Sequence, residues 1–323
     1  MLVFYYRPQD GATLRLGPGT LGRATGGGVC GGAAGPDGQD GGTTWGPVQL
    51  VYEEGGDRMV TIGNPCPVVD RDTGTIWLPF TRDNDDVFVT SSDDDGLTWA
   101  PPRKITDDVK AADWTWYATG PGNGIQLTHP SHRGRLVVPC DHRVGTIADR
   151  NQSTRSHVIY SDDHGLTWKR GEATAGAMNE CQVVERRDGS LLLNMRSYRG
   201  KARRAVATSA DGGLTWSPPV DDPTLVEPVC QAGLIRLENE ERSGETVLLF
   251  SNPASASERA RLTVRASFDE GTTWPVDRLV EEGSSAYSCL AQLRDGTIGL
   301  LYERDDYRRI TLTSFALDWL RRR

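Results

Sequence analysis

The stretch Ser161-Asp162-Asp163-His164-Gly165-Leu166-Thr167-Trp168 decides the fold, because its pattern Ser-x-Asp-x-Gly-x-Thr-Trp recurs along the chain. Full copies also begin at Ser92, Ser209 and Ser267, and a degraded copy ends at Trp45. Each full copy follows a short apolar or alternating run, so it marks the end of one strand and the start of the next. Ser and Asp side chains accept hydrogen bonds from turn N–H groups, glycine permits a positive φ and tryptophan supplies apolar area. We therefore predict that every copy forms a hairpin turn.

A second signal recurs between these turns: a glycine followed by an apolar strand, at 73–78, 133–138, 188–193 and 295–300. The repeating unit is roughly 50 residues long and holds several short strands, which is the size of one propeller blade. The 37 glycines and 18 prolines, with few helix-length periodic runs, also favour an all-β protein. Counting the pieces before Trp45 and after Trp274, we predict an all-β, six-bladed β-propeller that forms a single domain over residues 1–323.

Residues 1–44 depart from this pattern. Between Gly11 and Gly42 the sequence is dominated by Gly, Ala, Pro and Thr, with glycine runs at 26–28 and 31–32 where strands are expected. We therefore expect an irregular first blade. Two explanations stay open: a truncated or frame-shifted start to the coding sequence, or a genuine but atypical blade.

Charge and hydropathy exclude several classes of partner. The net charge of −8 and the isoelectric point near 5.2 argue against a general nucleic-acid binder, which needs a basic surface. Arginines lining one pocket would still admit an anionic ligand. No apolar run is long enough to span a membrane, and residues 1–7 lack the basic start and apolar length of a signal peptide. The default expectation is a cytoplasmic protein without membrane insertion.

The six cysteines lie scattered along the chain without the spacing of metal ligands. Buried free thiols, with at most one or two disulfides, are the expected state. We expect neither a metal ion nor an organic cofactor.

Charged residues far apart in the sequence are predicted to converge on one face of the propeller. Glu180 starts a strand and Arg196 ends the next one, and antiparallel pairing brings such positions together. Arg259 starts a strand whose far end is one of the tryptophan-ended turns, so it lies on the face opposite those turns. Tyr287 and Glu303, at the start and the end of two successive strands, belong to the same face.

Two tryptophans and one histidine allow competing interpretations. Trp114 and Trp116 lie beside a glycine-rich loop and could form a wall for sugar stacking, although composition alone favours packing between blades. His142 follows Asp141 at a strand end, where a histidine is more often a satisfied structural residue than an acid or base. His142 is therefore left out of the predicted catalytic set.

The recurring turn resembles the Asp box of the sialidase (neuraminidase) superfamily, and the chain from Trp45 to Leu320 looks like a bacterial exo-sialidase of the glycoside hydrolase type. Asp boxes also occur in propellers without sialidase activity, so sharper motifs carry the resemblance. These motifs are Asn-Glu-Cys-Gln at 179–182, Asn-x-Arg at 194–196, Arg-x-x-Leu-Thr-Val-Arg at 259–265, Ser-Ala-Tyr-Ser at 285–288 and Leu-Tyr-Glu at 301–303.

The resemblance implies a role for each of five residues. Tyr287 would be the nucleophile and Glu180 the base that takes its proton. Arg196 and Arg259 resemble the second and third arginines of the triad that binds the substrate carboxylate. Glu303 resembles the carboxylate that orients the first arginine of that triad.

The chemistry explains why these residue types occur together. A sialic acid carries a carboxylate on its anomeric carbon, and planar guanidinium groups can hold that carboxylate in a bidentate manner. A neutral phenol activated by a neighbouring base can attack there without facing a like charge. Trp114 and Trp116 fall in a segment similar to the one that reaches over the substrate. The implied partners are sialylated glycans, glycoproteins or gangliosides.

The N-terminal part of the family pattern is not legible in this sequence. The family places an Arg-Ile-Pro segment near the start and an acid/base aspartate about two dozen residues later. Tyr6-Arg7-Pro8 is out of register with that pattern, Asp40 belongs to the degraded Asp box and Asp37 is a poor substitute. The sequence therefore predicts an exo-α-sialidase with an impaired leaving-group acid. A catalytically inactive sialic-acid-binding propeller and an Asp-box module for protein contacts stay open as alternatives.

Loss of the acid predicts a specific bias between substrates. General acid catalysis contributes about 10² to 10⁴ in rate, and an activated aryl leaving group needs it least. Aryl sialosides should therefore be hydrolysed far better, relative to natural sialosides, than by an intact sialidase assayed in parallel. The comparison uses the ratio of kcat/KM for the aryl sialoside to kcat/KM for the natural sialoside. An equal ratio in this protein and in the intact sialidase would contradict the expectation.

Overall fold

The computed structural model describes residues 2–6, 15–16, 27–33, 49–55, 60–237 and 246–322, and before residue 49 it describes the backbone alone. The described elements are β-strands apart from three short helices, α1 (Thr106–Val109), α2 (Arg150–Ser153) and α3 (Leu317–Arg321). The all-β prediction is confirmed. None of the helices in this part of the chain has the length and apolar character needed to cross a membrane.

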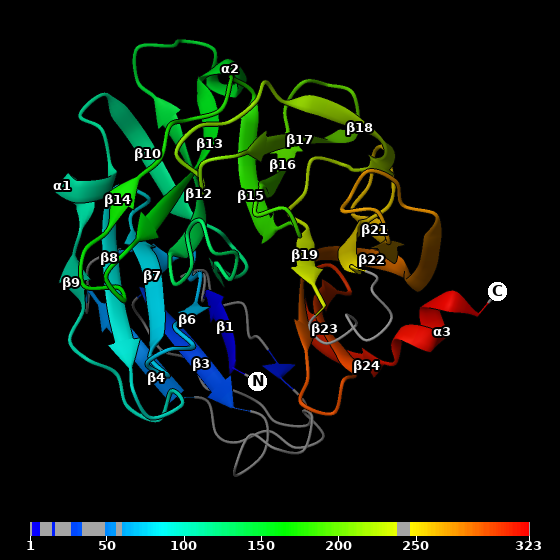
Figure 1. Ribbon diagram of the computed structural model, residues 1–323, viewed down its shortest axis with the longest axis horizontal. Coiled ribbons are helices and arrows are strands. Elements are labelled where there is room, and N and C mark those ends of the chain that lie inside the picture. Colours follow the sequence, from blue (N-terminus) through cyan, green and yellow to red (C-terminus); the bar gives the residue numbers. More distant parts are fainter. Residues whose placement is uncertain are drawn as a thin grey trace.

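The described strands form five hydrogen-bonded sheets around a common centre (Figure 1). The first has the order β1-β3-β4, with bounds Leu2–Tyr6, Gly27–Ala33 and Gln49–Glu54. The second has the order β5-β7-β8-β9 with β6 beside β7, and its bounds are Ile62–Gly63, Ile76–Arg82, Asp86–Ser92, Arg103–Lys104 and Val68–Val69. The third has the order β10-β12-β13-β14 with β11 beside β12, and its bounds are Trp114–Thr119, Leu136–Val144, Thr154–Ser161, Lys169–Arg170 and Ile125–Gln126.

The remaining two sheets carry the residues of greatest interest. The fourth has the order β15-β16-β17-β18, with bounds Met178–Glu185, Leu191–Ser197, Arg203–Ser209 and Val220–Val226. The fifth has the order β19-β20-β21-β22-β23-β24-β2, with bounds Gly233–Arg236, Leu248–Pro253, Ala260–Ser267, Val276–Gln292, Ile298–Arg304, Arg309–Phe315 and Arg15–Leu16.

The predicted count of six blades is wrong. In the described residues, four of the five sheets have four or more strands and form propeller blades, while the N-terminal sheet has three strands. Strand β22 is 17 residues long; its first half pairs with β21 and its second half with β23. Because this strand is continuous, a region expected to form two blades forms one seven-stranded sheet. The recurring motif marks turns between strands and does not show where one sheet ends.

The apolar core lies between neighbouring sheets. One buried cluster joins Val89 of β8 to Val138 and Ile159 of the third sheet, and another joins Val158 of β13 to Val183 of β15. Alternate residues of each strand therefore bury against the next sheet, as expected when sheets pack face to face. This packing sets the separation between side chains that belong to different blades.

The Asp-box turns form as predicted. In the turn at Ser161, the Gly165 N–H donates to Ser161 Oγ at 2.8 Å, and Thr167 donates to Asp163 through its N–H at 2.9 Å and its hydroxyl at 2.6 Å. Gly165 has a φ of 84°, and the indole of Trp168 is buried in the core. The same hydrogen bonds recur in the other three full copies, which begin at Ser92, Ser209 and Ser267.

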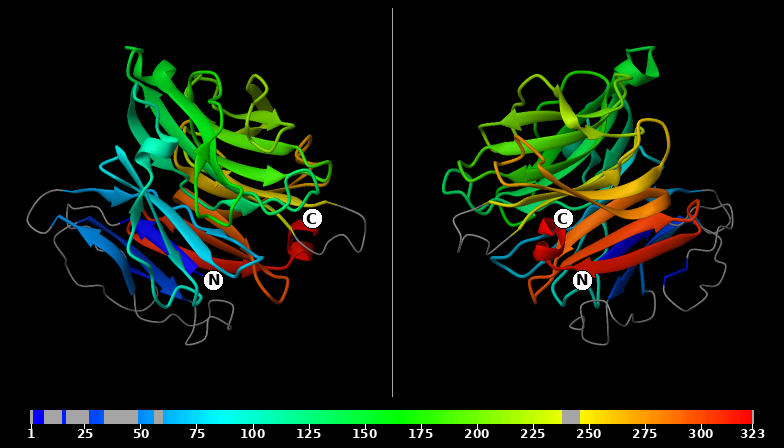
Figure 2. Two further views of the ribbon diagram at one scale, coloured as in Figure 1. Left: turned by 60° about the vertical axis from the view of Figure 1, so that its left-hand side comes forward. Right: turned by 90° about the vertical axis from the view of Figure 1, so that its right-hand side faces the viewer.

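The first and last segments of the chain lie side by side. Strand β2 pairs in parallel with β24, and Figures 1 and 2 show N-terminal strands next to the C-terminal ones. Of residues 1–44, only the backbones of β1, β2 and β3 are described. Arg7, Asp37 and Asp40 lie outside the described residues, as does most of the stretch from Gly11 to Gly42, but the glycine-rich segment Gly27–Ala33 forms strand β3.

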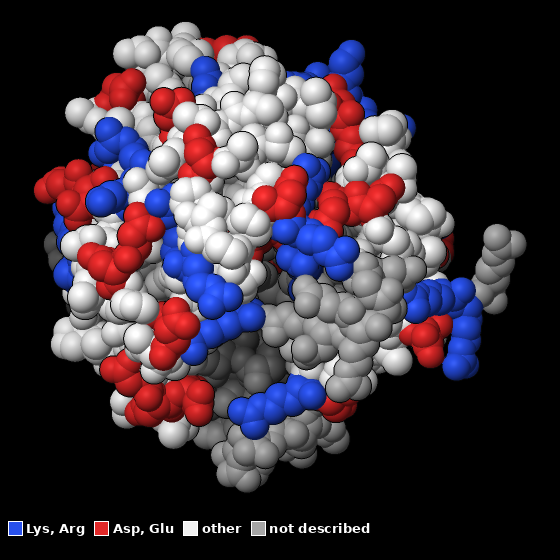
Figure 3. All heavy atoms as spheres, in the orientation of Figure 1, with Lys and Arg blue, Asp and Glu red and all other residues white. Residues whose placement is uncertain are grey.

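Some of the positive side chains of this acidic protein gather in one place, although others are scattered over the same face (Figure 3). On the face shown in Figure 3, Lys and Arg side chains border a hollow near the middle of the molecule, among acidic and uncharged neighbours. A net charge of −8 is therefore compatible with a site for an anion.

The Asp-box hydrogen bonds predict a pH-dependent contribution to stability. Burial opposes ionisation of Asp211, but hydrogen bonds from Thr215 and Ser209 outweigh it, so the pKa of Asp211 lies below its usual value. Asp211→Ala should lower the free energy of unfolding at neutral pH by about 1–3 kcal/mol. A carboxyl with a lowered pKa in the folded state contributes above its unfolded pKa of about 3.9 and loses this contribution as the pH falls through the folded value.

Urea unfolding at several pH values measures this difference. The gap between wild type and Asp211→Ala should be full at pH 7 and shrink below about pH 4. Asp107→Ala, at an exposed carboxylate of α1, is the matched control and should change stability by less than about 0.5 kcal/mol. A gap that does not change with pH would contradict the role assigned to the charged carboxylate.

Candidate active site

Glu180 is turned toward Arg196 by an irregularity in strand β15. The register pairs Met178 with Ser197 and then Cys181 with Met195, so two residues of β15 oppose the single residue Arg196. Such a β-bulge re-aims the side chains of the bulged strand. The Glu180 side chain is 10% exposed, and its Oε2 accepts a hydrogen bond from Arg196 Nη1 at 2.7 Å.

Tyr287 is placed by a second irregularity of the same kind. Strand β22 pairs Ser285 with Arg304 and then Ser288 with Tyr302, so two residues including Tyr287 oppose Glu303. The Tyr287 N–H donates to Glu303 Oε2 at 3.0 Å. The Tyr287 hydroxyl donates to Glu180 Oε1, which joins the fourth and fifth sheets at this point.

Burial and the charge of Glu180 keep the Tyr287 hydroxyl protonated. Burial is the main cause that raises the pKa of Tyr287, and the neighbouring Glu180 carboxylate adds to it, while Arg196 opposes the shift. Burial disfavours charge on Arg196, but Glu180 and Tyr287 outweigh it, so the pKa of Arg196 lies above its usual value. Tyr287 is therefore a neutral phenol that donates a hydrogen bond to Glu180. The neighbouring guanidinium of Arg196 stays charged.

Arg259 lies over the ring of Tyr287. Its Cζ is 5.6 Å from the centre of the Tyr287 ring, within the range of a cation–π contact. Its hydrogen bonds run to Tyr307 Oη at 2.8 Å and to the Val229 carbonyl at 3.3 Å, and it has no ion pair with any described residue. Arg196 also has spare capacity, because its hydrogen bonds to Glu180 and Tyr287 both run from Nη1. The two guanidinium groups thus offer unused donors next to the phenol.

Glu303 contacts the backbone of Tyr287. Burial raises the pKa of its carboxyl group, whereas the bond from the Tyr287 N–H and the charge of Arg259 oppose the shift. The arginine that the family pattern would pair with Glu303 is not legible in the sequence, and its nearest candidate, Arg7, lies outside the described residues. In the described part of the chain, Glu303 anchors the bulge that carries Tyr287.

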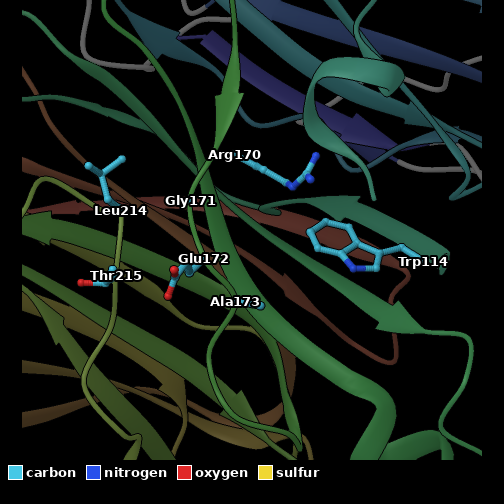
Figure 4. Close-up of a pocket in the computed structure, with 7 residues that line it drawn as sticks. All are labelled: Trp114, Arg170, Gly171, Glu172, Ala173, Leu214 and Thr215. Atoms are coloured by element: carbon cyan, nitrogen blue, oxygen red, sulfur yellow. The ribbon is translucent and has the colours of Figure 1, made fainter. Parts of the chain in front are cut away.

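Trp114 and Trp116 are not brought into this cluster. The Trp114 ring stacks on His142, with ring centres 3.3 Å apart, and it lines a cleft of about 560 Å³ together with Arg170. Figure 4 shows this cleft, with Trp114 and Arg170 on one side and Leu214 and Thr215 on the other. Trp116 lies under the Arg143 guanidinium at 4.9 Å. Neither indole has a hydrogen bond or ring contact with Tyr287, Glu180, Arg196 or Arg259 among the described residues.

Sequence reasoning missed a polar network beside Glu180. Asn179 Nδ2 donates to Asp141 Oδ2, and Tyr198 donates to Asn179 Oδ1 at 3.3 Å. The Tyr198 ring lies 5.3 Å from Arg196 Cζ. Asp141 is fully buried, and burial together with the charge of Glu180 raises its pKa well above the usual value. The only available signals were the Asn-Glu and Cys-Asp-His strings, which do not show that these residues meet.

His142 is a structural residue, as the sequence analysis assumed. It is buried, it stacks on Trp114, and its Nδ1 is 3.0 Å from His157 Nδ1. Burial lowers the pKa of His142 far below its usual value and lowers the pKa of His157 to about 3. Both rings are therefore neutral at physiological pH, which fits a packed core.

One group of side chains in the described residues has metal-ligand spacing, and it is already hydrogen-bonded internally. It consists of Asp70, Asp72 and His164. Gln126 Nε2 donates to Asp70 at 2.9 Å and to Asp72 at 3.1 Å, and His164 Nδ1 lies 2.8 Å from Asp70. These contacts connect neighbouring sheets and favour a structural link over a cation site. The five described cysteines, which exclude Cys30, are free thiols.

The environment of Tyr287 predicts how its ionisation responds to substitution. Removing the Glu180 charge by Glu180→Gln removes a cause that raises the pKa of Tyr287 and leaves Arg196, which lowers it. Tyr287 should therefore ionise at lower pH in the variant than in the wild type. Ultraviolet absorbance of tyrosinate measures this shift, with Tyr287→Phe in each background isolating the signal of that one phenol. An unchanged or higher titration midpoint would show that Glu180 and Tyr287 are not coupled.

Comparison with known proteins places these features in a family. A family model described as a BNR repeat-like domain matches residues 37–300. A sialidase of Micromonospora viridifaciens is 38% identical over 306 residues, covering 87% of this chain and 46% of the relative. A sialidase of Bacteroides fragilis is 32% identical over 294 residues, covering 82% of this chain and 52% of the relative. The chain thus spans about half the length of these curated relatives.

A solved structure agrees with the sequence comparisons. The "Hadza microbial sialidase Hz136" superposes with a TM-score of 0.80 at 33% identity, covering 91% of this chain and 60% of that one. The propeller architecture, the BNR repeats and the identity to curated sialidases point to one conclusion. This chain belongs to the BNR-repeat sialidase family.

Proposed function

We propose that this protein is an exo-α-sialidase that removes terminal sialic acids from glycans, glycoproteins or gangliosides. One observation carries the proposal: the Tyr287 hydroxyl is hydrogen-bonded to Glu180 and lies near two guanidinium groups, Arg196 and Arg259, that retain free donors. The names of the relatives support the same activity.

The arginines account for recognition of the substrate. Arg196 and Arg259 would hold the carboxylate that a sialic acid bears on its anomeric carbon, and a guanidinium binds such a group through two parallel N–H donors. Arg259 lacks an ion pair among the described residues, so a substrate carboxylate would not have to displace an internal anion. The anomeric carbon would then lie next to the Tyr287 hydroxyl.

A tyrosine nucleophile suits a substrate that is already charged. Most retaining glycosidases use a carboxylate nucleophile, and sialidases with a tyrosine are a recognised exception to this rule. A carboxylate about 4 Å from the substrate carboxylate would cost on the order of 4 kcal/mol at an effective dielectric of 20. The neutral phenol of Tyr287 avoids this repulsion.

Glu180 accepts the phenol proton of Tyr287 in the first step and returns it in the second. As Tyr287 Oη forms a bond to the anomeric carbon, the phenol proton passes to Glu180 and the bond to the leaving oxygen breaks, so that this oxygen departs as an anion and takes a proton from the solvent. Water then attacks the same carbon and loses one proton to the solvent, while the bond to Tyr287 breaks and Glu180 returns its proton to the phenolate. Two displacements give net retention of configuration. The leaving-group acid has no candidate among the described residues that contact Tyr287.

Separate assays of turnover and binding test the proposal. Wild type should hydrolyse an aryl sialoside, Tyr287→Phe should abolish turnover and Glu180→Gln should lower kcat by about 10² to 10⁴. Both variants should still bind free N-acetylneuraminic acid, because the arginines are intact, whereas Arg259→Ala should weaken binding. Tyr52→Phe, at a remote phenol bonded to Glu54, is the control. Binding by the wild type without any turnover would instead indicate a sialic-acid-binding protein.

A further inference from the structure

Arg259 is oriented by neutral partners alone in the described structure. Its Nη1 donates to Tyr307 Oη at 2.8 Å and its Nη2 donates to the Val229 carbonyl at 3.3 Å. An arginine has five N–H donors, so these two bonds leave three for a ligand. Because a phenol and a carbonyl carry no charge, they fix the guanidinium without neutralising it.

Tyr307 comes from a turn that local preference alone would not adopt. In the hairpin between β23 and β24, the consecutive residues Asp305, Asp306 and Tyr307 have φ values of 52°, 51° and 64°. Non-glycine residues rarely occupy this left-handed region, and such strain persists only where the surroundings enforce it. The surroundings of the hairpin must therefore stabilise the left-handed conformation of Tyr307.

The turn is held against β22 by contacts of its own. The Asp306 N–H donates to Ser284 Oγ at 3.1 Å, and Arg304 forms an ion pair with Glu281 at 3.0 Å. These bonds tie the hairpin to the strand that carries Tyr287. Tyr307 is 51% exposed, so core packing does not explain its position. Its one directed contact in the described structure is the bond from Arg259.

We propose that Tyr307 is a positioning residue that holds the Arg259 guanidinium over Tyr287, with its remaining donors directed at the substrate carboxylate. This inference rests on the proposed sialidase function and adds a residue to that site. A carboxylate at this position would pair with Arg259 and compete with the substrate, which explains why a neutral hydroxyl is the suitable partner.

Tyr307→Phe removes the hydroxyl and keeps the ring. If Tyr307 orients Arg259, the variant should show a KM for an aryl sialoside about tenfold higher, the size expected for one hydrogen bond to a charged group, with kcat within about twofold. The carboxylate is bound in both ground and transition states, so its loss of orientation affects KM more than kcat. The dissociation constant of free N-acetylneuraminic acid should rise by a similar factor. The melting temperature should not change, because the residue is exposed.

A double-mutant cycle with Arg259→Ala separates positioning from other roles. If Tyr307 acts through Arg259, Tyr307→Phe should have no further effect on KM in the Arg259→Ala background. An equal effect in both backgrounds, or a KM unchanged by Tyr307→Phe in an active enzyme, would overturn the inference alone. A wild type that neither binds N-acetylneuraminic acid nor hydrolyses the aryl sialoside would overturn the proposed function and this inference with it. Tyr52→Phe again serves as the matched phenol control.

Discussion

The hydrogen bond from Tyr287 to Glu180 joins two sheets through residues that are 107 positions apart in the chain. It forms only if the fourth and fifth sheets are held at one separation, and the buried cluster of β15, β16, β19 and β20 side chains between them provides that constraint. A small change in this packing would pull the phenol away from its proton acceptor, because a hydrogen bond weakens steeply with distance and angle. The chemistry of the site therefore depends on the apolar core behind it.

The electrostatics of the site follow from the same arrangement. Glu180 is paired with Arg196, whereas Arg259 is held by a phenol and a carbonyl. The cluster thus keeps one positive charge without an ion-pair partner among the described residues, which is what an anionic sugar requires. Burial, and after it the charge of Glu180, raises the pKa values of Tyr287 and Asp141. An acidic protein can therefore present a cationic site, because neighbours within a few ångströms matter more than the net charge.

The Asp-box turns and the site use opposite ends of the strands. Each turn satisfies its own backbone N–H groups with Ser and Asp side chains and places a tryptophan against the sheets. The strand ends away from these turns are then free to differ between blades. Three of these strand ends carry register irregularities next to the site. They lie at Glu180, at Tyr287 and at Arg261, two residues after Arg259. A repeated scaffold with varied strand ends can hold an asymmetric site.

The local features of this protein were determined by its sequence alone. The hairpin turns follow from residue types that act within eight positions, and the common face of Glu180 and Arg196 follows from antiparallel pairing. The number of blades was mispredicted, because the continuity of β22 depends on which strands pair and no local signal marks it. The bulges, the stacking of Trp114 on His142 and the contact of Tyr307 with Arg259 were likewise decided by the tertiary structure. Strand alternation predicts which face a side chain takes, but a one-residue bulge or a contact between sheets arises only when distant strands are packed together.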